Sequence, residues 1–433
     1  MSFPRYQKYK ESGVEWIGNV PDHWDVKRIG YYFAERREKV SDKDFAALSV
    51  TKNGIVPQLD TAAKSDDGDN RKKVCKGDFV INSRSDRKGS AGASDLDGSV
   101  SLICTVLQPQ EKVHTPFIHH LLRCQPFQEE FYRNGKGIVA DLWSTNYSEM
   151  RNIVLGMPPL PEQMNVAAFL DQETAKIDDL VAEQQRLMEL LKEKRQAVIS
   201  HAVTKGLNPN APMKPSGIEW LGDVPKHWEV MSLRRCVLGV QTGGTPSTEA
   251  PSIDLEHGMV WYTPGDFSDS LKLVTSTRKI SPEIVMSGEA KVFPPGSVLV
   301  VSIGATLGKV GFAEQASSSN QQINAVIPNE RVNGYFLAYS LLVKTEVMRF
   351  LSNASTIGIM NQEKTKEIWI VVPPKREQEE ITVFLDTDLA KLDTLTAEAQ
   401  RAIDLLQERR TALISAAVTG QIDVRPLLKK EAA

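Results

Sequence analysis

The sequence is poor in the features that mark secreted, membrane or metal-binding proteins. It has four cysteines in 433 residues and no CxxC pair, which argues against a disulfide framework or a cysteine-ligated metal and favours buried thiols in a cytoplasmic protein. No apolar run approaches the roughly 20 residues of a membrane span, and no apolar stretch follows the basic N-terminal residues, so we expect no secretory signal. With 25% charged and 41% hydrophobic residues, the composition predicts a soluble globular protein.

An excess of positive charge is also missing. The formal net charge is −3 at pH 7, which argues weakly against nucleic-acid binding because phosphate contacts require lysine and arginine. Basic residues nevertheless gather at 71–73 and at 84–88. A solvated surface explains any single cluster of this kind, so charge alone leaves the partner undecided.

No set of residues has the spacing of a catalytic or metal site. Residues 304–310, GATLGKV, have three residues between the glycines and valine after the lysine, whereas a P-loop has four residues and then Ser or Thr. The Pro-Pro pairs at 158–159 and 373–374 have no amide or carboxylate before them and no aromatic after them, as an amino-methyltransferase motif requires. The histidines lack Cys, Asp or Glu partners at ligand spacing. We therefore predict no catalytic residue and no metal site.

What the sequence does contain is repetition. Residues 12–29, SGVEWIGNVPDHWDVKRI, and 216–233, SGIEWLGDVPKHWEVMSL, are identical at ten of eighteen positions. Residues 157–180 return as 372–395, where PPLPEQ becomes PPKREQ. Four tryptophans recur with the first block, which favours packing at a junction between domain and helix over stacking on bases: Trp16, Trp24, Trp220 and Trp228.

Two stretches between the repeated blocks, 30–145 and 234–360, share little sequence. We expect strands near 78–81, 101–107, 297–303 and 324–327, and helical stretches near 116–132 and 334–351. Each insert is thus predicted to be a compact α+β domain. A duplicated frame with two divergent inserts predicts two recognition surfaces of one architecture but different specificity, related by an internal pseudo-twofold axis.

Two long helices are predicted after the Pro-Pro pairs. Residues 162–203 contain no glycine or proline, and apolar residues recur at the 3-4 spacing of a coiled coil. The predicted seam is Ile177, Leu180, Gln184, Leu187, Leu191, Lys194 and Val198, with Leu392, Leu395, Ala399, Ala402, Leu406, Arg409 and Leu413 as its second copy. About 40 residues make a helix on the order of 60 Å long. We expect the two stripes to pair within the chain, antiparallel, with the inserts at opposite ends; an ordinary helical hairpin without a spacing role is the alternative.

The predicted organisation is two α+β recognition domains separated by two long antiparallel helices that form a coiled coil. The expected boundaries are 1–157 for the first recognition domain, 158–210 for the central helix and linker, 211–372 for the second recognition domain, and 373–433 for the C-terminal helix and tail.

These blocks carry a family likeness. The repeated SGxEW segments, the PPLPEQ and PPKREQ helix starts, and the QTGGTP and SNQQINAVIP segments of the second insert together resemble the specificity (S) subunit of type I restriction-modification systems. The resemblance spans nearly the whole chain. It implies a non-catalytic subunit in which each recognition domain reads one half of a bipartite, asymmetric duplex DNA site, while the helices set the gap between the halves.

The resemblance also implies partners. Two methyltransferase subunits dock on such a chain, and motor-nuclease subunits add restriction. The resemblance implies no cofactor on this chain, and places S-adenosylmethionine, ATP and Mg on the partner subunits. The alternative function is a non-catalytic coiled-coil scaffold whose inserts bind proteins, and a self-sufficient enzyme is a third, weaker hypothesis. Salt-sensitive binding to duplex DNA separates the first two.

Base readout requires forked donors and acceptors on loops, Arg for guanine and Asn or Gln for adenine. The candidates in and beside the first insert are Asn82, Arg84, Arg87, Lys88 and Asn146, and those in and beside the second are Thr242, Gly243, Gly244, Thr245, Lys309, Asn320, Gln321, Gln322 and Asn361. Asn146 and Asn361 align at an offset of 215. The alternative for the Asn and Gln residues is capping of turns, and for the arginines a solvated turn.

Overall fold

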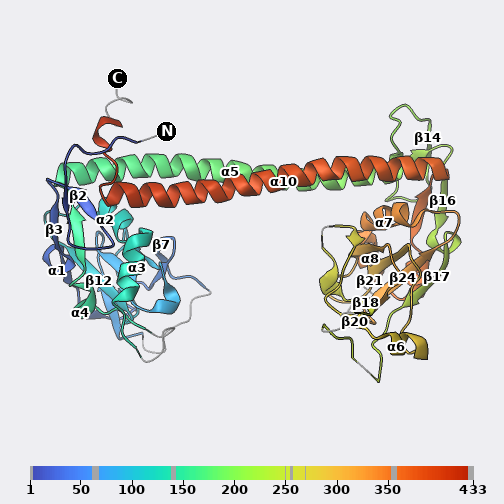
Figure 1. Cartoon of the computed structure of the whole chain (residues 1–433), viewed down its shortest axis with the longest axis horizontal. Coiled ribbons are helices and arrows are strands. Elements are labelled where there is room, and N and C mark those ends of the chain that lie inside the picture. The colour runs from blue at the N-terminus through green and yellow to red at the C-terminus, as the bar shows by residue number, and fades with distance from the viewer. Residues whose placement is uncertain are drawn as a thin grey trace. The chain divides into compact units, whose positions relative to one another are not determined.

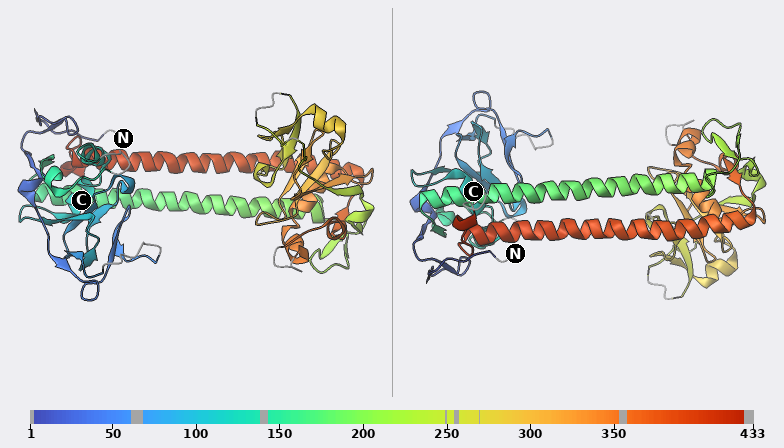
Figure 2. Two further views of the ribbon diagram at one scale, coloured as in Figure 1. Left: turned by 90° about the horizontal axis from the view of Figure 1, so that it is seen from below. Right: turned by 90° about the horizontal axis from the view of Figure 1, so that it is seen from above.

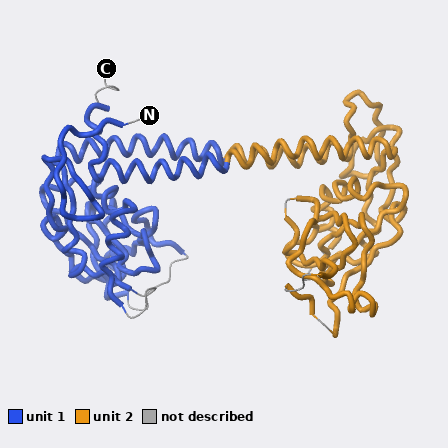
Figure 3. Tube along the Cα trace, in the orientation of Figure 1, with its two compact units in different colours: residues 1–185, 400–433 blue, residues 186–399 orange. Residues whose placement is uncertain are grey.

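The computed structural model describes residues 3–60, 68–137, 143–248, 250–253, 257–268, 270–352 and 358–427. Two compact units make up the chain: unit 1 is residues 1–185 with 400–433, and unit 2 is residues 186–399 (Figure 3). Each unit contains a globular α+β part and a portion of both long helices, α5 (Leu160–Lys205) and α10 (Lys375–Val418). The predicted α+β class is confirmed. The functional division into recognition domains and helical regions stays a prediction.

In unit 1, a four-stranded antiparallel sheet has the order β10-β9-β12-β4. Its strands are Ala91–Ala93, Phe79–Asn82, Cys104–Pro109 and Phe33–Glu35. Smaller sheets join β11 (Gly98–Val100), β8 (Arg71–Val74) and β5 (Lys39–Val40), the hairpin β6 (Leu48–Thr51) and β7 (Gly54–Pro57), β1 (Tyr9–Glu11) and β2 (Asn19–Pro21), and β3 (Asp25–Arg28) and β13 (Val154–Met157). The helices are α1 (Ile29–Tyr32), α2 (Thr115–Leu121), α3 (Gln125–Arg133) and α4 (Tyr147–Met150), with a 3₁₀ turn η1 at Ser85–Arg87.

In unit 2, the main sheet has the order β17-β24-β21-β22-β19. Its strands are Val237–Thr242, Ile323–Pro328, Ser297–Val301, Val310–Ala313 and Lys272–Leu273. Smaller sheets join β20 (Lys279–Ile280), β18 (Met259–Tyr262) and β23 (Ser318–Ser319), β14 (Met213–Pro215) and β15 (Asp223–Pro225), and β16 (Glu229–Ser232) and β25 (Trp369–Val372). The helices are α6 (Pro282–Ser287), α7 (Gly334–Leu342), α8 (Thr345–Ser352) and α9 (Gln362–Lys366), with 3₁₀ turns η3 (Leu233–Arg235) and η4 (Pro264–Asp266).

The two globular parts share one architecture despite their unlike sequences. The order β10-β9-β12-β4 in unit 1 corresponds to β22-β21-β24-β17 in unit 2. In both units two helices follow a central strand of this sheet, β12 in unit 1 and β24 in unit 2. A frame strand pairs with the closing strand in both, β3 with β13 and β16 with β25. The prediction of a common architecture is confirmed. Each helical stretch expected as one is a pair of helices, divided near Cys124 in unit 1 and near Val343 in unit 2.

The helix starts are fixed in the same way in both units. Glu162 on α5 accepts a hydrogen bond from Trp24 Nε1 at 2.9 Å, and Glu377 on α10 accepts one from Trp228 Nε1 at 2.9 Å. Both indole rings are fully buried. The expected packing role is therefore confirmed for these two tryptophans. Trp220, by contrast, remains 42% exposed.

The glutamines next to these glutamates repeat a second set of bonds. Gln163 Nε2 donates to the carbonyls of Lys112 and Pro158 at 3.1 and 2.9 Å, and Gln378 Nε2 donates to those of Arg331 and Pro373 at 3.1 and 2.8 Å. Their Oε1 atoms each accept a backbone N–H, from His114 and from Asn333. Each pair therefore ties the loop before a domain helix to the Pro-Pro turn.

The long helices lie side by side and run antiparallel within each unit (Figures 1 and 2). In unit 1, Arg410 Nε on α10 donates to Asp178 Oδ1 on α5 at 2.9 Å. In unit 2, Arg195 on α5 pairs with Asp393 on α10. The two arginines and the two aspartates are each 215 positions apart, so the repeat extends to the ion pairs across the seam.

The predicted register of the seam is wrong at alternate positions. Leu180, Leu187 and Leu395 are 45, 42 and 46% exposed. The residues that turn inward alternate by four and three: Leu170, Thr174, Ile177, Val181, Gln184, Met188, Leu191, Arg195, Val198 and Ala202 on α5, and Leu385, Leu389, Leu392, Thr396, Ala399, Ile403, Leu406, Arg410, Leu413 and Ala417 on α10. The predicted positions Ile177, Gln184, Leu191, Val198, Leu392, Ala399, Leu406 and Leu413 belong to this stripe; Lys194 and Arg409 are exposed, and Ala402 lies beside it.

Three of the cysteines, Cys104, Cys124 and Cys236, are buried and free, and Cys75 is half-buried and free. No helix among the described residues is long and apolar enough to cross a membrane.

Candidate nucleic-acid interface

In unit 1 the candidate residues lie on the turn after β9. Asn82 Oδ1 accepts a hydrogen bond from Arg84 N at 3.1 Å, which starts the turn, and η1 follows. Arg84 Nε donates to Asp86 Oδ1 at 2.9 Å, so this guanidinium is partly engaged. The Arg87 side chain is 68% exposed and lies 3.8 Å from the same carboxylate. Lys88 is exposed. The turn therefore presents Arg87 and Lys88 most freely.

The segment 143–146 braces this turn. Ser85 N donates to Trp143 O at 2.9 Å, and Thr145 N donates to Ser83 O at 2.9 Å. Asn146 then begins α4, but its exposed side chain makes no capping hydrogen bond. The structure thus brings Asn146 next to the 82–88 turn and leaves its amide available.

In unit 2 the two candidate strings form one site. Gly243 N donates to Ile323 O at 3.0 Å, and Gly244 N donates to Ser319 O at 2.8 Å. Thr245 Oγ1 donates to Gln321 Oε1 at 3.1 Å. A side chain at 243 would meet Ser319 Oγ at 2.2 Å, so only glycine allows this approach.

Some side chains of this site are engaged in hydrogen bonds within the protein. Asn320 Oδ1 accepts from Gln322 N at 3.1 Å and its Nδ2 donates to Gln322 Oε1 at 3.0 Å, which is the turn-capping role given above as the alternative for Asn320. Thr242 Oγ1 donates to Asn324 Oδ1 at 2.8 Å. Gln321 is exposed. Among the amides of this string, Gln321 is the one most open to a ligand.

Asn361 and Lys309 have roles within the fold. Asn361 caps α9, because its Oδ1 accepts from Lys364 N at 2.9 Å. The next residue, Gln362, reaches Thr242 Oγ1 at 3.0 Å and so joins α9 to the glycine loop. Lys309 Nζ donates to Phe267 O at 3.0 Å and keeps its remaining hydrogens for other acceptors.

A hollow of about 600 Å³ in unit 2 borders the turn that carries Asn320 and Gln322. Asn320 and Gln322 line it together with Arg278 and the segments 263–266 and 303–306. The 303–306 segment follows β21, the counterpart of β9, so it occupies the place that the 82–88 turn occupies in unit 1. Sequence reasoning missed Arg278. Its only signal was a cation in a polar stretch, TSTRK, with no motif around it.

The basic cluster at 71–73 serves the fold of unit 1. Arg71 is buried and its Nε donates to Ser99 Oγ at 2.9 Å. Lys72 Nζ donates to Cys104 O at 2.8 Å, and Lys73 Nζ to Glu38 Oε1 at 2.9 Å. These charges are satisfied inside strand β8 and its neighbours, so they add little to any surface for DNA.

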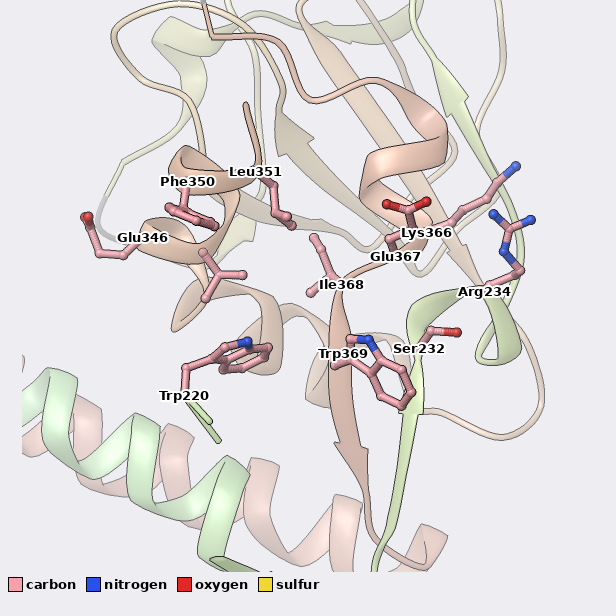
Figure 4. A pocket seen from close by; sticks show the side chains of 11 residues that line it. Trp220, Ser232, Arg234, Glu346, Phe350, Leu351, Lys366, Glu367, Ile368 and Trp369 are labelled. Atoms are coloured by element: carbon pink, nitrogen blue, oxygen red, sulfur yellow. The ribbon is translucent and has the colours of Figure 1, made fainter. Parts of the chain in front are cut away.

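A different hollow in unit 2, of about 670 Å³, is mainly apolar. Figure 4 shows Trp220, Phe350, Leu351, Ile368 and Trp369 around it. Phe350 is 79% exposed. Apolar side chains gathered in this way at a surface mark contacts with other molecules.

Comparisons with known proteins agree with this arrangement. Residues 225–404 match the family model described as "Type I restriction modification DNA specificity domain". A putative type I restriction enzyme MjaX specificity subunit from Methanocaldococcus jannaschii is 21% identical over 97% of this chain and 99% of its own length. The chain is thus similar to type I specificity subunits, and the similarity to the MjaX subunit extends over nearly its whole length. The specificity subunit of the type I restriction enzyme EcoBI from Escherichia coli is 21% identical over 74% of this chain and 68% of its own.

A solved structure shares the fold of this chain. A chain from the structure titled as the basis of complex assembly and conformational transition of the type I R-M system superposes with a TM-score of 0.71 at 18% identity, over 92% of this chain and 98% of that chain. The family model and the curated relatives confirm the family resemblance predicted from the repeated blocks.

Proposed function

We propose that this chain is the DNA-recognition subunit of a type I restriction-modification complex, and that each unit reads one half of a bipartite, asymmetric duplex site. The observation that carries the proposal is that equivalent loops of one shared architecture hold different side chains. After β9 stand Arg84, Arg87 and Lys88, whereas around the counterpart of that turn in unit 2 stand mainly threonines and amides, with one arginine, Arg278. Arginine favours guanine and amides favour adenine, so the two units would read unlike half-sites.

In this proposal the long helices set the gap between the half-sites and offer docking surfaces to two methyltransferase subunits. A paired, continuous helix such as α5, with 46 residues, supports a spacing role because it resists bending better than a loop. Motor-nuclease subunits would add restriction. The complex would act in the cytoplasm.

The chain itself would do no chemistry. The target base in each half would be flipped into a pocket of a methyltransferase partner, with S-adenosylmethionine held there, and ATP and Mg held on partner subunits. The apolar hollow around Trp220, Phe350 and Trp369 supports a contact with a protein, and a methyltransferase subunit is the partner that the proposed function requires.

The test is to co-express this chain with the methyltransferase subunit of its own system and map methylated adenines across the genome. A split motif with two unlike halves and a fixed gap is the expected result. Exchange of residues 234–360 for the insert of a relative should then change one half and preserve the other. A change in both halves would refute separate reading by the two units.

The alternative is a coiled-coil scaffold that binds only proteins, which the same apolar hollow also supports. A scaffold would assemble with partners yet leave the genome unmethylated, and its affinity for duplex DNA would lack the steep salt dependence of phosphate contacts.

A further inference from the structure

A hollow of about 400 Å³ in unit 1 gathers cations from distant parts of the chain. Its lining includes Lys52 from the β6–β7 turn, Lys88 from the turn after η1, Arg123 from between α2 and α3, and Arg410 from α10, together with His119 and His120. Among the described residues that line it there is no aspartate or glutamate. An acidic chain has thus placed four cations around one opening.

Most of this positive charge has no internal counterion. Arg410 is compensated, because its guanidinium pairs with Asp178 on α5. Lys52, Lys88 and Arg123 form no ion pair within the described part of the chain. Burial and the neighbouring Arg123 lower the pKa of His119 to about 3, so its ring is neutral. Three cations therefore share the hollow uncompensated, which is unfavourable unless an anion joins them.

Arg123 is held in place by its own surroundings. Its Nη1 contacts the His119 ring, its Nη2 donates to the backbone carbonyl of Lys52, and its buried Nε has no hydrogen-bond partner among the described residues. The same guanidinium thus connects the turn that carries Lys52 to helix α2. Burial and Arg410 lower the pKa of Arg123, which is the direction that mutual repulsion between two cations produces.

The hollow borders the candidate DNA surface of unit 1. Lys88 lines it and also ends the turn that carries Arg84 and Arg87. Gly89, next along the chain, has φ +83, and a side chain there would approach Gln128 Oε1 to 3.1 Å, so glycine keeps this wall close-packed. An anion in the hollow would therefore lie beside the turn whose arginines face the bases in the proposed function.

We propose that this hollow binds a backbone phosphate of duplex DNA through Lys52, Lys88 and Arg123. The proposal rests on the proposed function and adds residues that a search for base-reading motifs does not find. A phosphate contact carries no sequence information but fixes the register of the protein on the duplex. Bound there, the phosphate would position the 82–88 turn over the half-site that unit 1 reads.

Lys52→Gln tests the proposal, because this side chain is exposed and its backbone carbonyl stays available to Arg123. The variant is assembled with its methyltransferase subunits, and binding to a duplex with the mapped site is measured by fluorescence anisotropy from 0.05 to 0.3 M KCl. Loss of one phosphate contact should reduce the slope of log K against log salt by about 0.9, which is about eightfold in affinity at 0.1 M. Preference for the mapped site over a scrambled duplex should not change, and Lys52→Arg should restore the slope.

Lys8→Gln is the matched control, because Lys8 is an exposed lysine of unit 1 that lines no part of the hollow; its slope should equal that of the wild type. An unchanged slope for Lys52→Gln, in a complex that still selects the mapped site, would overturn the phosphate site alone. A wild-type complex with no site preference would overturn the proposed function and this proposal together. A third case is that the hollow binds a free anion and not DNA. Thermal melts in inorganic phosphate and in chloride at equal ionic strength detect it. If Lys52→Gln abolishes a stabilisation by phosphate but leaves the salt dependence of DNA binding unchanged, the proposal is wrong.

Discussion

Replacing Glu162 with alanine should loosen the junction between frame and helix in unit 1. The Glu162 side chain is 7% exposed and also pairs with His23 Nε2 at 2.7 Å. It accepts hydrogen bonds from Tyr6 OH at 2.7 Å and Trp24 Nε1 at 2.9 Å, and both donors are buried. Truncation leaves these two donors without an acceptor. Since a buried hydrogen bond to a charged group is worth about 1.5–3 kcal/mol, we expect a loss of about 3 kcal/mol.

The equivalent change in unit 2 supplies the comparison. Glu377 accepts from Trp228 Nε1 at 2.9 Å and pairs with His227, but its side chain is 35% exposed. Water can therefore replace part of the lost contact, and the position corresponding to Tyr6 is Asn210. We expect Glu377→Ala to cost about 1 kcal/mol, because it leaves one buried donor and screening is stronger.

Hydrogen exchange followed by mass spectrometry measures the two junctions separately in the intact chain. At about 1.4 kcal/mol per decade, the loss in unit 1 should speed exchange of peptides from 19–28 by about a hundredfold, and the loss in unit 2 should speed those from 223–232 by about fivefold. Glu162→Gln keeps an acceptor for Trp24 and should fall between wild type and alanine. Equal effects of the two alanine variants, or a larger one in unit 2, would refute the assignment of strength from burial and hydrogen-bond count.

Three further predictions concern single positions. Gly243→Ala should distort the glycine loop and weaken recognition of only the half-site read by unit 2, since the new Cβ would lie 2.2 Å from the Ser319 hydroxyl oxygen. Gly244→Ala should leave the methylated motif unchanged, because no atom lies within 4 Å of the new Cβ. Mapping of methylated adenines across the genome measures both. His119 has a pKa of about 3 in the folded state and near 6.5 in the unfolded state, so protonation of the unfolded chain lowers the stability as the pH falls below 6.5. The loss should be about 1.4 kcal/mol at pH 5.5. Thermal melts of wild type and His119→Gln should therefore differ in their dependence on pH, and equal dependences would contradict this. Ile177→Ala should cost about 2–4 kcal/mol of unfolding free energy in urea, because Ile177 is 4% exposed, while Leu180→Ala, at 45% exposed, should cost under about 1 kcal/mol. An equally large cost for Leu180→Ala would restore the register predicted from sequence.

The error in that register has a simple physical origin. Positions 177, 184, 191 and 198 satisfy a seven-residue repeat, but the residue between each pair can lie three or four positions on. Leucine at 180 and 187 favoured a spacing of three, whereas in the structure the half-buried residues are Val181 and Met188. Arg195 also faces the seam in unit 2, where its pairing with Asp393 makes a charged residue acceptable. A hydrophobicity pattern contains no information about that partner.

Part of the candidate site was also predictable from sequence, and part was not. Strand ends and turns were predictable from local sequence, and the two glycine-loop and amide strings could be named as candidates. Their contact with each other, through Gly243 and Ile323, joins residues 80 positions apart and follows only from strand pairing. The hollow with Lys52 and Arg123 was not predictable, because its cations come from four segments with no motif in common.

The repeated and the divergent residues have different physical tasks, and this distinction locates specificity. Glu162, Gln163 and their counterparts 215 residues on bond to tryptophan side chains and to backbone groups at the helix starts, which any insert of this architecture requires. A frame with these bonds satisfied internally has few groups left for bases. The side chains that change between the units, Arg87 and Lys88 in one and Gln321 in the other, are exposed and largely free of such tasks. Exchange of an insert should therefore transfer a half-site, and exchange of the frame should not.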